Sequence, residues 1–305
     1  MEPLLALVGP TASGKTDAAE RLAPRLGVEI VSVDSMSVYR GMDVGTAKPS
    51  PEQRARVRHH LLDVAEPGEE FSVARYQRLA REAMAEIEDR GSRPLLVGGT
   101  GLYFRAVVDD LEFPPTDPEI RRALEAEAEG TGPEVLHATL AAADPEAASR
   151  IEPGNVRRTV RALEVAAVTG RPFSSFGAAW ERFPPERVRA AGVELPAETL
   201  RDRIERRVRS QFEAGLLEEI RALLAHGAGP SLTARQAIGY AEAIDHVAGR
   251  ISLDEAAERT VKRTRALARR QLSWFRRDPR IRWFRAGTGG ASELIDDLEE
   301  FYRRG

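Results

Sequence analysis

The residues from Gly9 to Thr16 carry the clearest chemical signal in the sequence. Their pattern is G-x-x-x-x-G-K-[ST], between an apolar stretch and a stretch with helical periodicity. In such a loop, glycines let backbone N–H groups surround an anion, and the start of the helix adds positive charge. Lys15 supplies a point charge, and the Thr16 hydroxyl can bind Mg²⁺. The pattern predicts a di- or triphosphate site formed by Gly9, Pro10, Thr11, Ala12, Ser13, Gly14, Lys15 and Thr16. It does not say whether a phosphoryl group is transferred.

Asp34 is the second candidate, because it ends an apolar strand-like stretch, "VEIVSV". In open α/β sheets, ligands bind at the carboxyl ends of the strands. Three roles are open for this carboxylate: a Mg²⁺ ligand, a general base for an incoming nucleophile, or the cap of a turn or helix. Thr100, in "GGTG" after a third apolar stretch, is expected at the same edge, also as a turn and helix cap.

The adjacent histidines His59 and His60 are less suited to chemistry. Neighbouring residues of an extended segment point to opposite faces, so a shared metal ion is not expected. We expect packing or hydrogen-bonding roles for both.

The composition describes a soluble globular protein. The chain has 305 residues, of which 42% are hydrophobic and 30% charged, enough for one large domain or two smaller ones. There is no cysteine, which excludes disulfides and thiolate metal sites and fits a cytoplasmic protein. We find neither a signal peptide nor an apolar run of about 18 residues, so no membrane association is expected.

The basic residues are unevenly distributed. Eleven Arg or Lys and one acidic residue, Asp278, lie between Arg259 and Arg285, although the net charge is −3. Such a segment indicates either an anionic partner or a solvated helix face. Only three of the 45 basic residues are lysines. A lysine kept against this bias indicates a need for a compact ammonium, which draws attention to Lys15 and Lys48.

Apolar periodicity predicts an α/β fold. Strands are expected at Leu4–Val8, Val28–Val33 and Pro94–Val97, alternating with helices, as in a mainly parallel sheet flanked by helices. The pattern becomes helix only after the Pro-rich "LEFPPTDPE", and we expect residues 110–189 to form an all-helical insertion between core segments 1–109 and 190–305. Single long helices are predicted from about Glu198 to Ala225 and from about Ser252 to Arg277, followed by a last strand, "RIRWF".

Seven segments, taken together and in order, resemble the tRNA dimethylallyltransferases, also called tRNA isopentenyltransferases. They span nearly the whole chain: "GPTASGKT", "DSMSVYRGMDVGTAKP", "HHLLDV", "GGTGLYFRAV", "NVRRTVRALEV", "RQAIGY" and "RTRALARRQLSWFRRD". The resemblance implies a P-loop core with a helical insertion. The absence of a Cys/His zinc segment makes the chain similar to bacterial members.

The resemblance implies an alkyl transfer rather than a phosphoryl transfer. Dimethylallyl diphosphate would occupy the loop, and its five-carbon group would move to the exocyclic amine of the adenosine 3′-adjacent to the anticodon. By the same resemblance, Asp34 would act as base for the amine. Lys15 and Thr16, with Mg²⁺ bound by Thr16, would stabilise the departing diphosphate, and Arg121 or its neighbour Arg122 would close on it.

The resemblance also implies a tRNA-binding surface for the anticodon stem-loop, with the protein acting as a monomer. Arg157, Arg158 and Arg161 share one face of a predicted helix, which suits phosphate contacts, although such a stripe is often only solvated. The implied set is Asp34, Ser35, Met36, Ser37, Thr100, Arg121, Arg157, Arg158, Thr159, Val160, Arg161, Arg235, Gln236, Gly239 and Tyr240.

Three alternatives remain open from the sequence. A relative that prenylates free adenine nucleotides would share the loop, but the helical insertion and the arginine stripe argue against it. A small-molecule or nucleoside-monophosphate kinase would also need an ATP lid and a phosphoryl acceptor site. A nucleotide-switched RNA-binding module would have no activity to lose on substitution of Asp34.

Overall fold

The structure is a computed structural model that describes residues 2–177, 182–225 and 230–304. The chain divides into two compact units. The core unit is Met1–Asp109 together with Pro184–Gly305, and the insertion unit is Asp110–Phe183.

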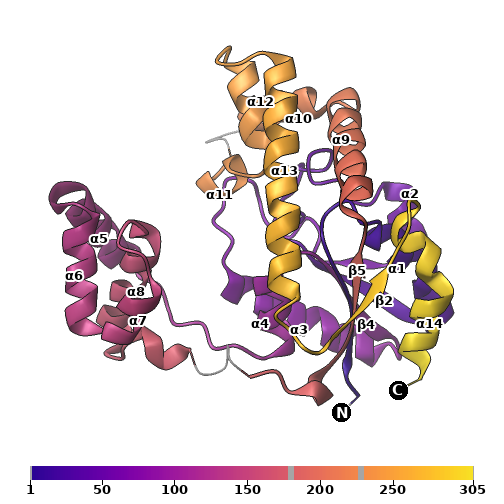
Figure 1. Cartoon of the computed structure of the whole chain (residues 1–305), viewed down its shortest axis with the longest axis horizontal. Helices are drawn as coiled ribbons and strands as arrows, with labels where there is room; N and C mark the ends of the chain where they lie inside the picture. Colours follow the sequence, from indigo (N-terminus) through magenta and orange to yellow (C-terminus); the bar gives the residue numbers. More distant parts are fainter. Residues whose placement is uncertain (1, 178–181, 226–229, 305) are drawn as a thin grey trace. The chain divides into compact units, whose positions relative to one another are not determined.

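The core unit is built on a six-stranded sheet in the order β3-β2-β4-β1-β5-β6 (Figure 1), and all neighbouring strands are parallel. The strands are β1 (Leu4–Val8), β2 (Val28–Val33), β3 (His59–His60), β4 (Arg93–Gly98), β5 (Val188–Glu194) and β6 (Ile281–Arg285). Their short runs rich in Val, Leu and Ile are typical of parallel strands covered on both faces. The prediction of a mainly parallel sheet flanked by helices is confirmed.

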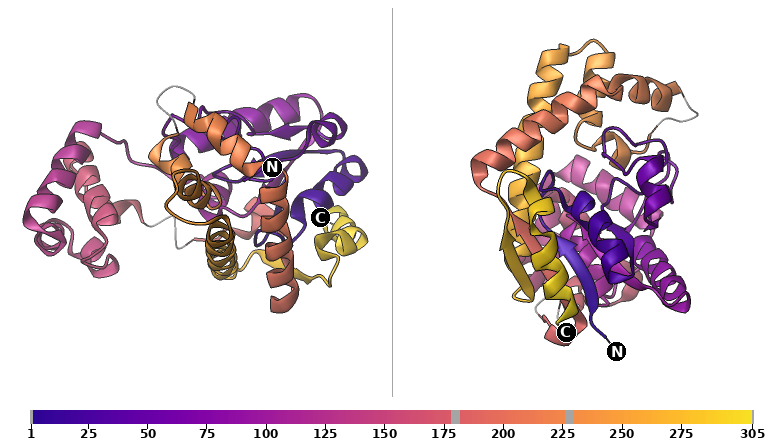
Figure 2. Two further views of the ribbon diagram at one scale, coloured as in Figure 1. Left: turned by 90° about the horizontal axis from the view of Figure 1, so that it is seen from above. Right: turned by 90° about the vertical axis from the view of Figure 1, so that its right-hand side faces the viewer.

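Helices cover both faces of the sheet (Figures 1 and 2). Those of the core unit are α1 (Lys15–Leu26), α2 (Pro51–Arg56), α3 (Val73–Asp89), α4 (Gly101–Val108), α9 (Ala197–Glu213), α10 (Leu216–Ala225), α11 (Leu232–Arg235), α12 (Tyr240–Val247), α13 (Leu253–Phe275) and α14 (Ile295–Arg303), with 3₁₀ helices η3 (Pro185–Arg187) and η4 (Gly290–Leu294). Leu5 and Leu7 of β1 pack with α1 and α14, whereas Ala6 and Val8 pack with α3 and α4. This alternation follows from the two-residue period of a strand.

The carboxyl ends of the strands bring the candidate residues to one edge of the sheet. Gly9 follows β1, Asp34 follows β2 and Gly99 follows β4. Because these three strands are neighbours and parallel, segments far apart in the chain meet at this edge.

The helix expected from Glu198 to Ala225 is in fact two helices, α9 and α10. The chain turns at Gly215, which has φ 98°, a conformation that glycine adopts without steric cost. Leu200, Ile204 and Val208 of α9 pack against Ala268 of α13. Within the described residues, no helix is long and apolar enough to cross a membrane.

The insertion unit consists of helices around a small core of its own. It contains α5 (Pro118–Thr131), α6 (Pro133–Ala143), α7 (Pro145–Arg150), α8 (Val156–Thr169) and the 3₁₀ helix η1 (Phe173–Phe176). Leu136, Leu140 and Leu163 are among its buried residues. The unit ends at Phe183, whereas we expected residue 189, because Val188 and Arg189 already pair with β1 as part of β5.

Candidate active site

The loop between β1 and α1 has the backbone of a phosphate cradle. Gly9 has φ 148°, and a Cβ there would lie 2.7 Å from the carbonyl oxygen of Val193, so only glycine fits. Ala12 has φ 63° and Gly14, at the helix start, φ 85°. Left-handed conformations of this kind turn successive N–H groups toward one side and create a concavity for an anion.

Lys15 lies inside this loop and has no acidic partner among the residues that the structure describes. Its Nζ donates to the carbonyl oxygen of Pro10 (2.6 Å) and to Ser13 Oγ (3.3 Å), and the residue is 8% exposed. Its pKa is lowered from 10.5 to about 7, mainly by burial and also by nearby Arg207, while Asp34 acts in the opposite direction. An anion bound in the loop would favour the ammonium form.

A row of polar side chains on α9, which the motifs of the sequence do not predict, faces the same region. Arg203 Nε donates to the carbonyl oxygen of Ala12 (2.8 Å), and Arg207 Nη2 donates to that of Thr46 (3.1 Å). Burial lowers the pKa of Arg207, and within the described part of the chain no carboxylate lies within ion-pair distance of it. A half-buried guanidinium with one neutral acceptor suits an anionic ligand.

Asp34 stands at the end of β2 with one oxygen occupied. Its Oδ1 accepts the N–H groups of Met36 (2.8 Å) and Ser37 (3.4 Å). Among the described residues no donor lies within hydrogen-bond distance of Oδ2. Ser35 N donates to Thr100 Oγ1 (3.1 Å), so the segment after Asp34 is also attached to the loop after β4. The half-buried carboxylate therefore has a fixed orientation and a free acceptor.

These groups line one cavity of about 570 Å³ in the core unit. Its walls come from the P-loop, from the segments after β2 and β4, from α9 and from α13. Apolar side chains, including Ile30, Leu62 and Val97, line part of it beside the charged groups. Gln271 of α13 accepts the N–H of Thr11 (2.8 Å) and so fixes the P-loop from the far end of the chain.

The two histidines make hydrogen bonds, as expected. His59 Nδ1 bonds with the carbonyl oxygen of Val57 (2.8 Å), and His60 Nε2 bonds with Glu29 Oε2 (2.7 Å). His59 also lines the cavity, where burial lowers its pKa. Within the described residues there is no group of three or more His, Asp or Glu that would hold a metal ion.

In the insertion unit, the sequence-predicted residues fall into two groups. The side chains of Arg157 and Arg158 are exposed on α8, whereas those of Thr159 and Val160 are buried. Arg121 and Arg161 share a partner, because each donates to the buried carboxylate of Glu164, at 3.0 and 2.8 Å. Arg122 is exposed, and its Nε donates to the carbonyl oxygen of Pro118.

The predicted residues of the "RQAIGY" segment also divide into exposed and buried ones. Arg235 and Gln236 are exposed, whereas Gly239 (φ 91°) and Tyr240 are buried. The Tyr240 hydroxyl bonds with Glu219, whose carboxylate also accepts the N–H groups of residues 43–45. Tyr240 therefore supports the segment after Asp34, and any contact it makes with a ligand would be indirect.

A P-loop at the carboxyl edge of a parallel sheet, beside a strand-end carboxylate, places the core unit among P-loop α/β proteins. A protein-family model described as IPP transferase matches residues 37–278. The chain belongs to this family, that of the tRNA dimethylallyltransferases, and the resemblance inferred from its motifs is confirmed.

Individual relatives cover nearly the whole chain. A tRNA dimethylallyltransferase from Streptomyces coelicolor is 51% identical over 292 residues, 95% of this chain and 93% of the relative. One from Thermobifida fusca is 49% identical over 302 residues, 97% and 93% of the two chains. Among crystal structures, the tRNA isopentenylpyrophosphate transferase of Bacillus halodurans has 40% identity and a TM-score of 0.72, covering 99% of this chain and 96% of its own. A eukaryotic dimethylallyltransferase acting on tRNA has 26% identity and a TM-score of 0.77, with 96% and 75% covered.

Proposed function

We propose that this protein transfers a dimethylallyl group from dimethylallyl diphosphate to tRNA. The acceptor is the exocyclic amine of the adenosine 3′-adjacent to the anticodon, and diphosphate is released. One observation carries the proposal: within the described residues, buried Lys15 and half-buried Arg207 have no acidic partner, and both line the same cavity as Asp34 in a member of this family.

The cationic side of the cavity would hold the leaving group. As the bond between the dimethylallyl carbon and the diphosphate oxygen breaks, negative charge grows on the departing diphosphate. Lys15, Arg207 and the backbone N–H groups of residues 9–16 are already in place, so little reorganisation is needed. Arg203 supports this side indirectly, because it holds the Ala12 carbonyl.

Asp34 would act on the nucleophile. The exocyclic amine of adenine is a poor nucleophile because its lone pair is conjugated with the ring. With Oδ1 held by Met36 and Ser37, Oδ2 can accept a hydrogen bond from the amine and take its proton as the N–C bond forms. The proton then leaves with the solvent or the product, and the diphosphate leaves with the electrons of the broken C–O bond.

The residues present fit a magnesium ion. The Thr16 hydroxyl is exposed at the cavity, and Asp17 follows it. Mg²⁺ prefers oxygen ligands, keeps several waters and is commonly bound through substrate phosphates, so it needs no cage of protein carboxylates. When bound, it would neutralise part of the diphosphate charge.

The tRNA would be held by exposed groups. We assign phosphate contacts to Arg157 and Arg158, and we retain Arg121 as a candidate for the diphosphate side. Anticodon-loop bases are unpaired, which makes extrusion of the target adenosine inexpensive. We propose that one monomer binds one stem-loop.

Product analysis tests this proposal. The purified protein is incubated with Mg²⁺, dimethylallyl diphosphate and an anticodon stem-loop, and the digested nucleosides are identified by mass spectrometry. A matched stem-loop with guanosine at the target position is the control. We expect one dimethylallyl adduct on the adenosine stem-loop and none on the control. An adduct only on free AMP would identify a nucleotide prenyltransferase, and ATP turnover without any adduct would identify a kinase.

A further inference from the structure

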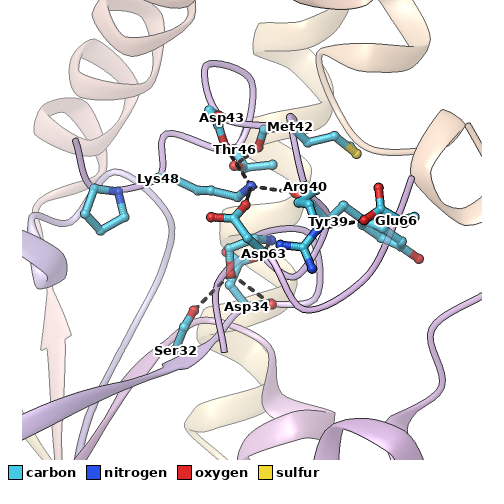
Figure 3. A network of polar contacts seen from close by, with 12 residues as sticks. Ser32, Asp34, Tyr39, Arg40, Met42, Asp43, Thr46, Lys48, Asp63 and Glu66 are labelled. Atoms are coloured by element: carbon cyan, nitrogen blue, oxygen red, sulfur yellow. Dashed lines mark hydrogen bonds and ion pairs between the residues drawn. The ribbon is translucent and has the colours of Figure 1, made fainter. Parts of the chain in front are cut away.

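Lys48, one of three lysines in a chain with 42 arginines, has an unusual environment. Its side chain is 1% exposed. The ammonium donates to the carbonyl oxygen of Tyr39, to Asp43 Oδ1 (2.7 Å) and to Asp63 Oδ1 (2.6 Å), as Figure 3 shows. All three of its N–H donors therefore have an acceptor, and two of the acceptors are carboxylates.

The three acceptors belong to different parts of the segment between β2 and β3 and just beyond. Tyr39 lies in the turn after Asp34, Asp43 lies in the next loop, and Asp63 follows β3. Lys48 thus joins residues that are up to 24 positions apart in the sequence, Tyr39 and Asp63. Arg54 is the second cation on Asp63.

A short chain of hydrogen bonds leads from Lys48 to Asp34. The N–H of Asp63 donates to the carbonyl oxygen of Ser37 (3.3 Å), and the N–H of Ser37 donates to Asp34 Oδ1 (3.4 Å). Beside this link, Val64 and Ala65 both donate to the carbonyl oxygen of residue 38. The turn that orients Asp34 is therefore bound along its length to the segment that Lys48 holds.

The same segment contains backbone conformations that need external support. Ala47 (φ 50°), Leu61 (φ 64°) and Asp63 (φ 58°) are all left-handed although none is glycine. Such conformations persist where surrounding contacts fix them. Two of these residues adjoin or contact Lys48, so its ammonium is well placed to provide that support.

Burial alone would disfavour the charge on Asp63. The hydrogen bonds from Lys48 and Arg54 outweigh it and hold the pKa of Asp63 below its usual range. Without Lys48, Asp63 would keep Arg54, but the Tyr39 carbonyl would lose the ammonium donor.

We propose that Lys48 is a positioning residue, which keeps the Asp34 carboxylate oriented for its role as base by joining Tyr39, Asp43 and Asp63. The inference rests on the proposed function of Asp34. The ammonium is required because its three N–H groups diverge toward three separate acceptors, whereas the planar guanidinium of arginine is longer and directs its donors within one plane.

Steady-state kinetics of Lys48→Met and Lys48→Arg test the role. We expect kcat to fall about 30-fold or more in both variants while KM for the prenyl donor and for the stem-loop stays within about 3-fold. The matched control is Arg40→Met, which removes a cation of the same segment from an exposed ion pair with Glu66 (Figure 3) and should change kcat less than about 2-fold. All assays are run well below the unfolding temperature of each variant.

The outcomes separate direct contact from positioning. A large rise in KM for the donor, with rescue by arginine, would mean that Lys48 touches the diphosphate and would overturn the proposal. An unchanged kcat in both variants would overturn it as well. Because Lys48→Met removes a buried cation with two carboxylate partners, Asp43→Asn serves as a milder variant for stability. We expect a loss in kcat of about 3-fold, because a neutral acceptor remains.

Two further measurements tie the effect to the chain of hydrogen bonds. Lys48→Met and Asp63→Asn should be non-additive in kcat, whereas additivity would contradict the link. Hydrogen exchange at the amides of residues 36–39 and 63–65 should become faster in Lys48→Met, and unchanged protection would also contradict it. This second readout needs no activity, so it remains informative if the wild-type protein fails to prenylate the stem-loop. In that case the proposed function fails, whereas a loss of protection would still show that Lys48 holds the segment.

Discussion

Two sets of buried or half-buried cations line the same cavity but differ in their partners. Lys15 and Arg207 contact only neutral acceptors within the described residues, whereas Lys48 contacts two carboxylates and a carbonyl. A buried charge without a partner carries a desolvation cost that folding does not offset. The difference indicates that Lys15 and Arg207 are kept for an anion that arrives with the substrate, and that Lys48 is kept for the protein itself.

Substitution of Asp34, which lines the same cavity, should have the largest effect on turnover. We expect Asp34→Asn to lower kcat about 1,000-fold, because the amide cannot take the proton of the adenosine amine. The dissociation constant of the stem-loop, measured by fluorescence anisotropy, should change less than about 3-fold. Equal losses in turnover and in stem-loop binding would contradict the assignment of Asp34 as base.

Removal of Lys15 or Arg207 should weaken the binding of the prenyl donor. Arg207→Met and Lys15→Met are each expected to raise KM for dimethylallyl diphosphate about 100-fold, since each removes a charge that faces the diphosphate.

The same variants distinguish the two sets of cations by stability. Without ligand, the melting temperature of Arg207→Met should be unchanged or higher than wild type, because a half-buried charge without an acidic partner among the described residues is lost. That of Lys48→Met should fall by at least about 5 °C, because Asp63 and the Tyr39 carbonyl lose a partner. Differential scanning calorimetry measures both, and a drop of equal size in the two would break the comparison.

The effect of pH on the binding of the prenyl donor should be smaller than the effects of these substitutions, and it should depend on Lys15. With its pKa lowered to about 7, Lys15 is largely neutral at pH 8 in the free protein, and the bound diphosphate restores its proton. Binding should therefore take up a proton above about pH 7, and affinity should fall by up to about tenfold per pH unit there.

Calorimetry at pH 8 in buffers of different ionisation enthalpy measures this proton uptake. The uptake should be smaller in Lys15→Met, by the contribution of Lys15.

The same lowered pKa also makes the stability of the ligand-free protein depend on pH. The unfolded chain binds more protons between about pH 7 and 10.5, so through this group the ligand-free protein becomes more stable as pH rises across that window.

The sequence predicted those parts of the site that are local in the chain. The P-loop is one continuous motif, and the structure has a strand before it and a helix after it, as the motif predicts; backbone geometry alone dictates its glycines. Asp34 could be placed at the sheet edge because the strand before it is short and apolar. The family resemblance then supplied roles for residues that no local pattern explains.

Arg207 was missed because its importance depends on tertiary burial. One signal was present in the sequence. Arg203, Arg207 and Gln211 repeat every four residues, next to the apolar row that begins at Leu200. The two arginines bind backbone carbonyls of the cavity wall, and Gln211 binds those of the adjacent Val44 and Gly45. The end of α9 before Gly215 was missed too. Helical periodicity continues on both sides of this glycine, and a single glycine within such a pattern does not by itself predict the end of a helix.

Exposed cations form a third class, with the smallest expected effects. Arg157 and Arg158 lie on the surface of α8, where ion contacts are screened by solvent. Each substitution to alanine should raise KM for the stem-loop about 2- to 4-fold and leave KM for the donor unchanged. It should also reduce the slope of log affinity against log salt concentration by about 1, the value for one lost phosphate contact. Glu129→Ala, an exposed change on α5 of the same unit, is the matched control. If the salt dependence matches wild type in both arginine variants, the stripe is only a solvated face, and tRNA must be gripped elsewhere.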